Sequence, residues 1–301
     1  TISGQYSQLI RFIQFSIALI AIALFDLFIY ESLPWVDDIT RYKVNFQYPI
    51  VYALNSNLTT PVWGGLIVLL VEVLQISIED TVKLLQYLIF CSMALILSFA
   101  TRSTLFTILL ISSLFITYSL DMVIGNLRQG IATIFFLYSI IYTKGLIRLI
   151  GMSLGVLTHN MMAVPFVIYY LHKIRIDRKI PKDIEQAIFI SPLIIGIILF
   201  ASNAPGDGGG RSIFGLMTYI LMYLLMYKNP TNSRTFYFAQ GILVFVSGTY
   251  IFFDQIIRYM GSFMSIIVLA SQELPKERQV MLIALIIISS IFLWAQRLQI
   301  G

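Results

Sequence analysis

Apolar stretches recur along the whole chain, and many of them are about twenty residues long. This recurrence restricts the fold more than any single motif does. A helix needs about 20 largely apolar residues to cross the roughly 30 Å of hydrocarbon in a bilayer. Hydrophobic residues make up 58% of the 301 residues and charged residues 12%, whereas a soluble domain has about 25% charged residues. The sequence therefore predicts an all-α, polytopic membrane protein, with residues 1–301 in a single membrane domain.

Hydropathy and the positive-inside rule predict about 10–11 membrane helices. The first apolar stretch is long for a signal peptide and lacks a small-residue cleavage site, so we expect it to be retained. Residues 31–61 are expected to form an outer loop. Residues 62–78 could cross the membrane, but we favour an interfacial or re-entrant helix, because a crossing would invert every later loop. The spans are predicted at residues 12–30, 83–101, 103–120, 129–143, a broken pair over 146–171, 184–201, 212–227, 236–253, 256–272 and 279–297.

With the amino terminus in the cytoplasm, most basic residues fall in cytoplasmic loops, and the net charge of +5 mainly reflects orientation rather than a nucleic-acid partner. The basic residues that remain on the outer side are Arg41, Lys43, Lys83, Arg128, Arg211, Arg258 and Arg297. Arg128, Arg211 and Arg258 lie at or near the start of a predicted span, and Arg41 lies in the outer loop. An arginine in hydrocarbon costs about 2.5–3.5 kcal/mol, although near an interface it can snorkel to water. Together the four arginines favour an anion-binding site on the outer face.

The sequence LTHNM, residues 157–161, lies in an apolar region too short for two full crossings. Because charge puts both ends of residues 146–171 in the cytoplasm, we expect two short helices that meet near His159, with Pro165 bending the return. Irregular backbone at membrane depth is tolerated only inside protein or beside a wet cavity, so His159 is expected to face an outer cavity. An interhelical hydrogen-bond donor and a catalytic base remain open as its roles.

The single cysteine, Cys91, excludes a disulfide framework, and the chain has no cluster of carboxylates. Neither a metal site nor a cofactor is therefore predicted. Residues 201–211 contain the run APGDGGG, which predicts a flexible outer loop, either a gate over a substrate path or a plain surface loop.

Three motifs resemble, in their order, those of the Wzy/EpsG-type family of bacterial polysaccharide polymerases: DDITRYKVNF at 37–46, NLRQGIA at 126–132 and LTHNMMAVPF at 157–166. In that family an acidic residue is followed by tyrosine and phenylalanine four and eight positions later, as Asp38 is here by Tyr42 and Phe46. Arg128-Gln129 is similar to the family's arginine–glutamine pair at the start of a helix. His159 is similar to the family's histidine, although the flanking phenylalanine and the serine–alanine after it are missing.

The resemblance becomes thinner after residue 175, where Arg258-Tyr259 with Ser262-Phe263 is similar to a late arginine that opens a span in the family. The family's acidic residue before a proline is replaced by Thr60 before Pro61. Members of the family tend to be longer, so by this comparison the end after Gln296 is expected to be incomplete.

The resemblance implies a glycosyltransferase with a GT-C-like membrane bundle. Such enzymes join polyprenyl-pyrophosphate-linked glycan repeat units on the outer face of the bacterial cytoplasmic membrane, as O-antigen, capsule or exopolysaccharide. The donor and acceptor would be undecaprenyl-pyrophosphate-linked oligosaccharides in the membrane lipid, with a chain-length regulator and a flippase as partner proteins. An O-antigen-type ligase and a flippase or transporter of the same glycans are the alternatives.

Each candidate residue receives a role from this chemistry. Guanidinium groups match phosphate oxygens in two-point contacts and stay charged in a dry site, which suits pyrophosphate without a metal ion. The acceptor hydroxyl needs a base, and a histidine takes a proton at neutral pH. The expected set is His159 and Asp38 as catalytic residues, Arg128, Gln129, Arg211, Arg258 and Arg41 for the pyrophosphate, and Asp37, Tyr42 and Trp35 for the sugars.

Overall fold

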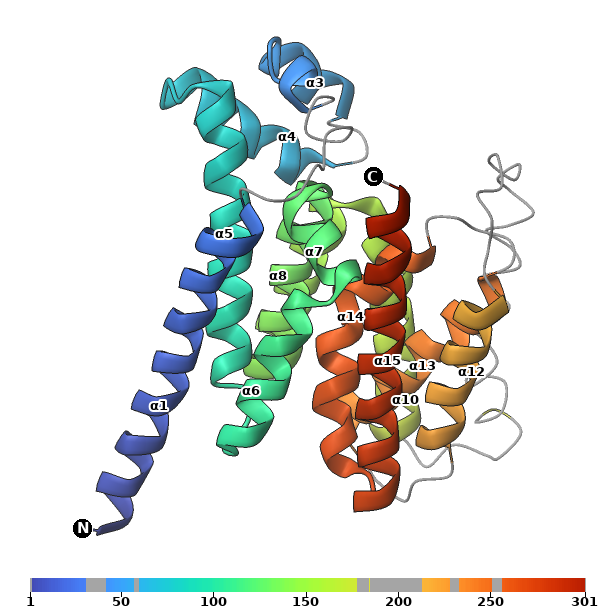
Figure 1. Cartoon of the computed structure of the whole chain (residues 1–301). Coiled ribbons are helices and arrows are strands. Elements are labelled where there is room, and N and C mark those ends of the chain that lie inside the picture. The colour runs from blue at the N-terminus through green and yellow to red at the C-terminus, as the bar shows by residue number, and fades with distance from the viewer. Residues whose placement is uncertain are drawn as a thin grey trace. The chain divides into compact units, whose positions relative to one another are not determined.

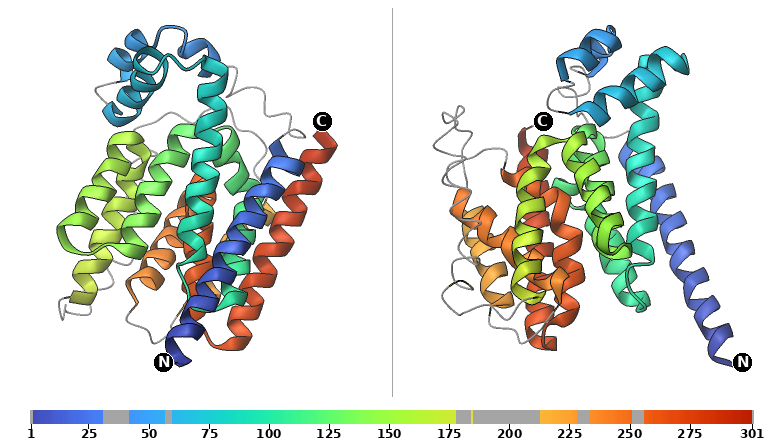
Figure 2. Two further views of the ribbon diagram at one scale, coloured as in Figure 1. Left: turned by 90° about the vertical axis from the view of Figure 1, so that its left-hand side faces the viewer. Right: turned by 180° about the vertical axis from the view of Figure 1, so that it is seen from behind.

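The computed structural model describes residues 2–30, 42–56, 60–177, 184, 213–227, 233–250 and 256–300. Within these ranges every regular element is a helix, which confirms the all-α prediction for the described part of the chain (Figures 1 and 2). The chain divides into two compact units, one of residues 1–115 and 119–163, the other of residues 116–118 and 164–301.

The first unit carries one long helix at the amino terminus and a series of helices of varied length after it. Its elements are α1 (Ile2–Leu24), η1 (Phe25–Tyr30), α3 (Pro49–Ser56), α4 (Pro61–Val68), η2 (Leu69–Val73), α5 (Ile78–Ser98), α6 (Thr104–Ser112), η3 (Ser113–Phe115), α7 (Thr117–Ile124), α8 (Leu127–Tyr142), α9 (Gly145–Thr158) and η4 (Asn160–Met162). The second unit consists of α10 (Ala163–Asp177), α12 (Ile213–Met226), α13 (Arg234–Thr249), α14 (Ile256–Ala270), η5 (Ser271–Glu273) and α15 (Lys276–Ile300).

Two helical segments in the described ranges, Ser7–Leu27 and Ile78–Ser98, are long and apolar enough to cross a membrane. Shorter apolar helices of 10–17 residues follow, including Leu127–Tyr142 and Gly145–Thr158. The stretch predicted as one span over 103–120 is instead divided into α6, η3 and α7. In it, the Ser113 hydroxyl donates to the Leu110 carbonyl at 2.6 Å, a local bond that competes with the regular helix ladder.

The helix α1 runs antiparallel to α5 and also contacts α6. Near one end, the side-chain amide of Gln14 donates to the Thr101 carbonyl at 2.7 Å and to the Thr107 hydroxyl at 3.0 Å. Near the other end, Phe25 stacks on Phe90 with ring centroids 4.2 Å apart. Both contacts are buried, and together they fix the direction and register of α1 against α5 and α6.

Small residues allow α8 and α9 to pack closely. A Cβ atom on Gly155 would lie 2.6 Å from Cδ2 of Phe136 and 3.1 Å from the Ala132 carbonyl oxygen. One turn earlier, Gly151 faces the Ser139 hydroxyl in the same way. The two glycines form the sequence GMSLG, the spacing that membrane helices use to bring two backbones together.

The far end of this helix pair is basic. Arg148 donates from Nε to the Ser139 carbonyl at 3.1 Å and from Nη2 to the Thr143 carbonyl, so it caps the carboxyl end of α8. Tyr142 donates to the Ile96 carbonyl at 2.6 Å, which brings the end of α5 to the same level. The residues Arg102 and Lys144, both exposed, therefore lie at this end as well.

The second unit repeats this arrangement of capped helix ends. Arg278 donates from Nη1 to the Tyr227 carbonyl after α12 at 3.0 Å, and Gln240 of α13 donates to the Met226 carbonyl at 2.6 Å. Aromatic rings fill the interior, where Phe238 contacts Tyr169 and Phe263 at centroid distances of 5.9 and 5.3 Å. These contacts tie α10, α12, α13, α14 and α15 together.

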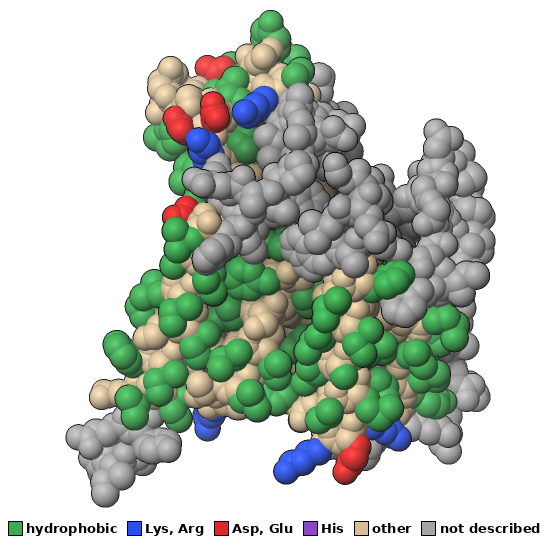
Figure 3. Space-filling model, viewed as in Figure 1, with side chains coloured by type: hydrophobic (Ala, Val, Ile, Leu, Met, Phe, Trp, Pro, Cys, Tyr) green, Lys and Arg blue, Asp and Glu red, His purple; other side chains and the backbone are tan. Residues whose placement is uncertain are grey.

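On the face of the molecule shown in Figure 3, apolar side chains cover much of the described helices, and the charged side chains lie near the helix ends. In α1, Phe12 is 67% exposed and Ile20 60%. In α15, Val280 is 65% exposed and Ile291 64%. Such exposed apolar faces are far larger than the isolated apolar side chains that a soluble surface carries.

Candidate functional site

Arg128 and His159 lie at the same end of the α8–α9 pair. The contact between Ala132 and Gly155 sets the register of these antiparallel helices. Arg128 comes one turn before Ala132, and His159 comes one turn after Gly155. Lys144 precedes α9 and Arg148 lies in its first turn, at the opposite end of the pair, so Arg128 and His159 are separated along the helices from these two basic residues.

Arg128 is half-buried in the first turn of α8, and Gln129 beside it is 5% exposed. Asn126 precedes the helix and makes no side-chain capping bond. Next to them, a Cβ atom on Gly130 would lie 2.8 Å from Cδ1 of Ile89 and 3.1 Å from the Met122 carbonyl oxygen. A glycine is therefore required where the start of α8 passes α5.

The position of Arg128 is electrostatically unfavourable for the helix itself. The amino end of a helix carries partial positive charge and attracts anions, whereas cations are favoured at the carboxyl end. Arg148 and Arg278 follow that preference, because each caps a helix carboxyl end. Arg128 does not, so its guanidinium and the positive end of α8 both favour an anion at the same place.

His159 ends α9 in an extended conformation, with φ −146° and ψ 110°, where the sequence predicts a break. Its imidazole is 6% exposed. Nδ1 accepts a hydrogen bond from the backbone N–H of Met161 at 3.2 Å. The predicted bend at Pro165 instead coincides with the first turn of α10, where proline is tolerated.

Tyr42 belongs to an aromatic cluster beside α3 and α4. Its ring lies 5.6 Å from Phe46 and 5.9 Å from Trp63 between centroids. The Trp63 indole donates to the Tyr52 hydroxyl at 2.9 Å. Phe46 and Trp63 are fully buried, whereas Tyr42 and Tyr52 are half-buried and lie at the edge of this cluster.

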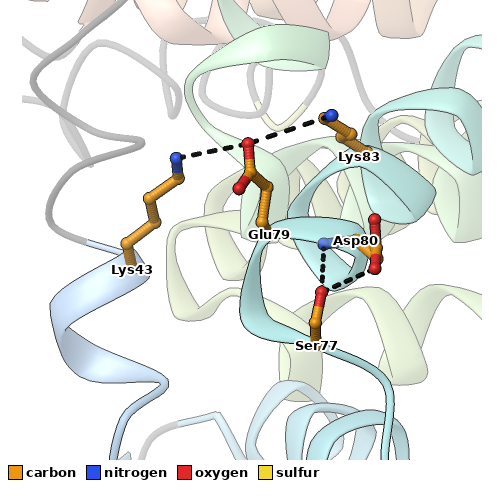
Figure 4. A network of polar contacts seen from close by, with 5 residues as sticks. All are labelled: Lys43, Ser77, Glu79, Asp80 and Lys83. Carbon is orange, nitrogen blue, oxygen red and sulfur yellow. Dashed lines mark hydrogen bonds and ion pairs between the residues drawn. The ribbon is translucent and has the colours of Figure 1, made fainter.

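A chain of polar contacts joins this region to the start of α5 (Figure 4). Glu79 Oε1 lies 3.9 Å from the ammonium groups of both Lys43 and Lys83. The Ser77 hydroxyl accepts from the Asp80 N–H at 3.1 Å, which caps α5. The ion pairs are about half exposed and each contributes little stability, but they hold the segment after the outer loop against α5.

Arg258 lies in the first turn of α14, and its side chain is outside the described residues. That helix end adjoins the end of α13, where Tyr250 contacts Gly215 at the start of α12. The starts of α12 and α14 therefore share one end of the second unit. The predicted residues Trp35, Asp37, Asp38, Arg41 and Arg211 lie outside the described residues, as do the predicted span 184–201 and loop 201–211.

Three polar contacts of the first unit are not predicted from the sequence. The Tyr87 hydroxyl donates to a carboxylate oxygen of Asp26 in η1, and the Gln86 amide donates to the Ile124 carbonyl at 2.9 Å just before Asn126. The signal for the first is an acidic residue inside an apolar stretch. The pairing of Lys43 with Glu79 has no signal, because opposite charges in two surface segments are common.

The described residues include no group of three or more His, Cys, Asp or Glu side chains that could hold a metal ion. No protein-family model matches the chain, and no curated protein or solved structure matches it.

Proposed function

We propose that the chain is a polytopic protein of the bacterial cytoplasmic membrane that polymerises polyprenyl-pyrophosphate-linked glycan repeat units on the outer face. The membrane placement is supported by the exposed apolar faces of α1 and α15 and by the GMSLG contact between α8 and α9. The outward direction is supported by the basic end of the α8–α9 pair, which the positive-inside rule assigns to the cytoplasm.

The observation that carries the proposal is the position of Arg128. It is half-buried in the first turn of α8, at the end that also holds His159 and away from Arg148. A guanidinium beside the positive end of a helix is suited to an anion with several oxygens, and a pyrophosphate on a lipid is such an anion. Gln129 adds an amide next to it, and Arg258, Arg211 and Arg41 complete the proposed set of pyrophosphate ligands.

In the proposed reaction a sugar hydroxyl of one lipid-linked unit attacks the anomeric carbon of the glycan on the other. The bond from that carbon to the pyrophosphate oxygen breaks, and the lipid pyrophosphate leaves with the electron pair. The arginines stabilise the negative charge that develops on it, a role in which each well-placed donor is worth about 2.7–4 kcal/mol. His159 or Asp38 takes the hydroxyl proton, while Asp37, Tyr42 and Trp35 hold the sugars.

A deletion strain tests the proposal. Without the protein, cells should make their surface polysaccharide only as single repeat units on the lipid carrier or on its acceptor, and plasmid-borne protein should restore the ladder of chain lengths on a gel. An unchanged ladder would overturn the polymerase proposal. Full-length chains that remain on the carrier would instead indicate a ligase, and repeat units that accumulate on the cytoplasmic face would indicate a flippase.

A further inference from the structure

The helix α3 has two unlike faces. Pro49 and Ala53, one turn apart, are buried, and the Tyr52 hydroxyl beside them accepts the hydrogen bond from Trp63 of α4. The residues on the other side are each between 54% and 70% exposed: Tyr48, Ile50, Val51 and Leu54. We call these four residues the α3 face. It contains no charged side chain, whereas a soluble surface exposes large apolar side chains mostly one at a time.

The start of α5 gives the level of the membrane in this unit. The 21 residues Ile78–Ser98 rise about 30 Å at 1.5 Å per residue, which is about the hydrocarbon thickness of a bilayer. A membrane-spanning α5 therefore has Ile78 and Ser98 at the two boundaries. Tyr142, at the basic end of the α8–α9 pair, bonds to Ile96 near Ser98. The positive-inside rule thus assigns Ile78 to the outer boundary.

Two connections bring α3 to this outer boundary. On one side, Lys43 Nζ lies 3.9 Å from Oε1 of Glu79 in the first turn of α5 (Figure 4). On the other side, α3 packs along α4, which continues through η2 and four further residues into α5. In both views of Figure 2, α3 and α4 lie at the end of the unit where α5 begins. The α3 face is therefore at the height of the lipid headgroups.

The composition of the α3 face matches the boundary of a bilayer. Helices at that boundary bury an apolar face about 5–10 Å deep, and tyrosine is enriched there. Leu69 and Val73 of the neighbouring η2 are exposed as well, and the exposed Leu84 and Leu88 lie deeper along α5. Lys43 is exposed beside the α3 face, where its ammonium group suits the lipid phosphates.

We propose that the α3 face is seated in the outer leaflet, at the boundary between headgroups and acyl chains. The inference rests on the membrane placement in the proposed function, and it gives this part of the predicted outer loop a lipid partner. The seat also holds the aromatic cluster of Tyr42, Phe46 and Trp63 at the surface of the bilayer, because α3 packs on α4.

Spin labels on single cysteines test the seat of α3. Cys91 is changed to serine, and a nitroxide is attached to Val51→Cys in the full chain, in bilayers of phosphatidylglycerol and phosphatidylcholine. Relaxation by oxygen, which concentrates in lipid, is compared with relaxation by a water-soluble nickel chelate. Leu88→Cys is the lipid reference, about 15 Å along α5 from Ile78. Lys144→Cys, exposed at the opposite end, is the reference in water.

We expect the Val51 label at a depth of about 5–10 Å, the Leu88 label deeper and the Lys144 label in water. Nickel access at Val51 with the Leu88 label in lipid would overturn the inference and leave the membrane placement standing. Exclusion of both reagents at Val51 would show that protein covers the α3 face, which also overturns it.

The failure of the proposed function gives different results. Nickel access at Leu88 as well as at Val51 would overturn the membrane placement and the seat of α3 together. An unchanged ladder of chain lengths in the deletion strain would remove the polymerase activity alone, because the spin labels report only where the α3 face lies.

Discussion

The side-chain amide of Gln14 in α1 donates a hydrogen bond to the hydroxyl of Thr107 in α6 at 3.0 Å, although 93 positions separate them in the sequence. The same amide reaches the Thr101 carbonyl at 2.7 Å, and Gln14 is 3% exposed. The buried amide of Gln14 is thus hydrogen-bonded both by the turn that follows α5 and by α6. This pairing explains how the long first helix is fastened to the rest of its unit.

Replacing Gln14 by leucine should therefore destabilise the protein. The part-buried Thr101 carbonyl and the buried Thr107 hydroxyl would lose a donor, at a cost of about 1–2 kcal/mol in the free energy of unfolding. Thermal denaturation of the detergent-purified protein, followed by size-exclusion chromatography, measures the change. The matched control is Gln8→Leu on the exposed side of α1, which should leave the midpoint unchanged. Equal midpoints for the two variants would contradict the prediction.

The close approach of α8 and α9 predicts that Gly155→Ala is harmful. The added methyl group would meet the Phe136 ring at 2.6 Å and the Ala132 carbonyl oxygen at 3.1 Å. Such overpacking costs about 1–3 kcal/mol. In α4, Gly65 has nothing within 4 Å of the position of an added Cβ atom. Gly65→Ala is thus the control, and by helix propensity alone it should be neutral or slightly stabilising. A stable Gly155→Ala variant would show that the helices pack in another register.

Arg128 should be required for chain extension and not for folding. Arg128→Ala should reduce extension by about tenfold or more, because a hydrogen bond to a charged group is worth about 1.5–3 kcal/mol. Arg128→Lys keeps the charge but loses the two-point contact, so we expect an intermediate loss. The control Arg102→Ala removes an exposed arginine at the opposite end of the unit. Membrane protein level is measured alongside the polysaccharide ladder, and an active Arg128→Ala variant at normal level would rule out the assignment.

The orientation of the first unit in the membrane can be tested by cysteine labelling. With Cys91 changed to serine, single cysteines at Lys83 and Lys144 would be exposed at the two opposite ends of the unit. In intact cells without an outer-membrane barrier, a thiol reagent that does not cross the membrane should label Lys83→Cys at once. Lys144→Cys should be labelled only after the membrane is opened. The reverse pattern would place Arg128 in the cytoplasm and remove the basis of the proposed site.

Much of the helical layout follows from the sequence, because apolar stretches of this length can adopt few structures other than helices. The break at His159 also follows, since residues 146–171 are too few for two full crossings. The sequence does not predict the division of the span over 103–120. Average hydropathy carries no information about the local hydrogen bond of the Ser113 hydroxyl. The signal for the α8–α9 contact was present in GMSLG, since glycines four residues apart line one side of a helix.

The candidate site is predictable only in part. Topology puts Arg128 and His159 at one level, because both lie at the same turn of an antiparallel helix pair. The hydrogen bond between Met161 and His159 depends on φ and ψ at the break and leaves no trace in the residue types. Likewise, the contact of Lys43 with Glu79 joins two exposed segments and cannot be inferred from either one.

The first turns of α5 extend past the level at which α8 begins, because Gln86 already lies beside Ile124 and Ile89 beside Gly130. The eight residues of α5 before Gln86 rise about 12 Å at 1.5 Å per residue, and Lys43 is paired with Glu79 along this rise. If Arg128 binds a lipid-linked pyrophosphate as proposed, a glycan anchored there would begin beside this rise of α5. Over this height such a glycan would meet the protein only with the sugars nearest its carrier, however long the chain beyond them.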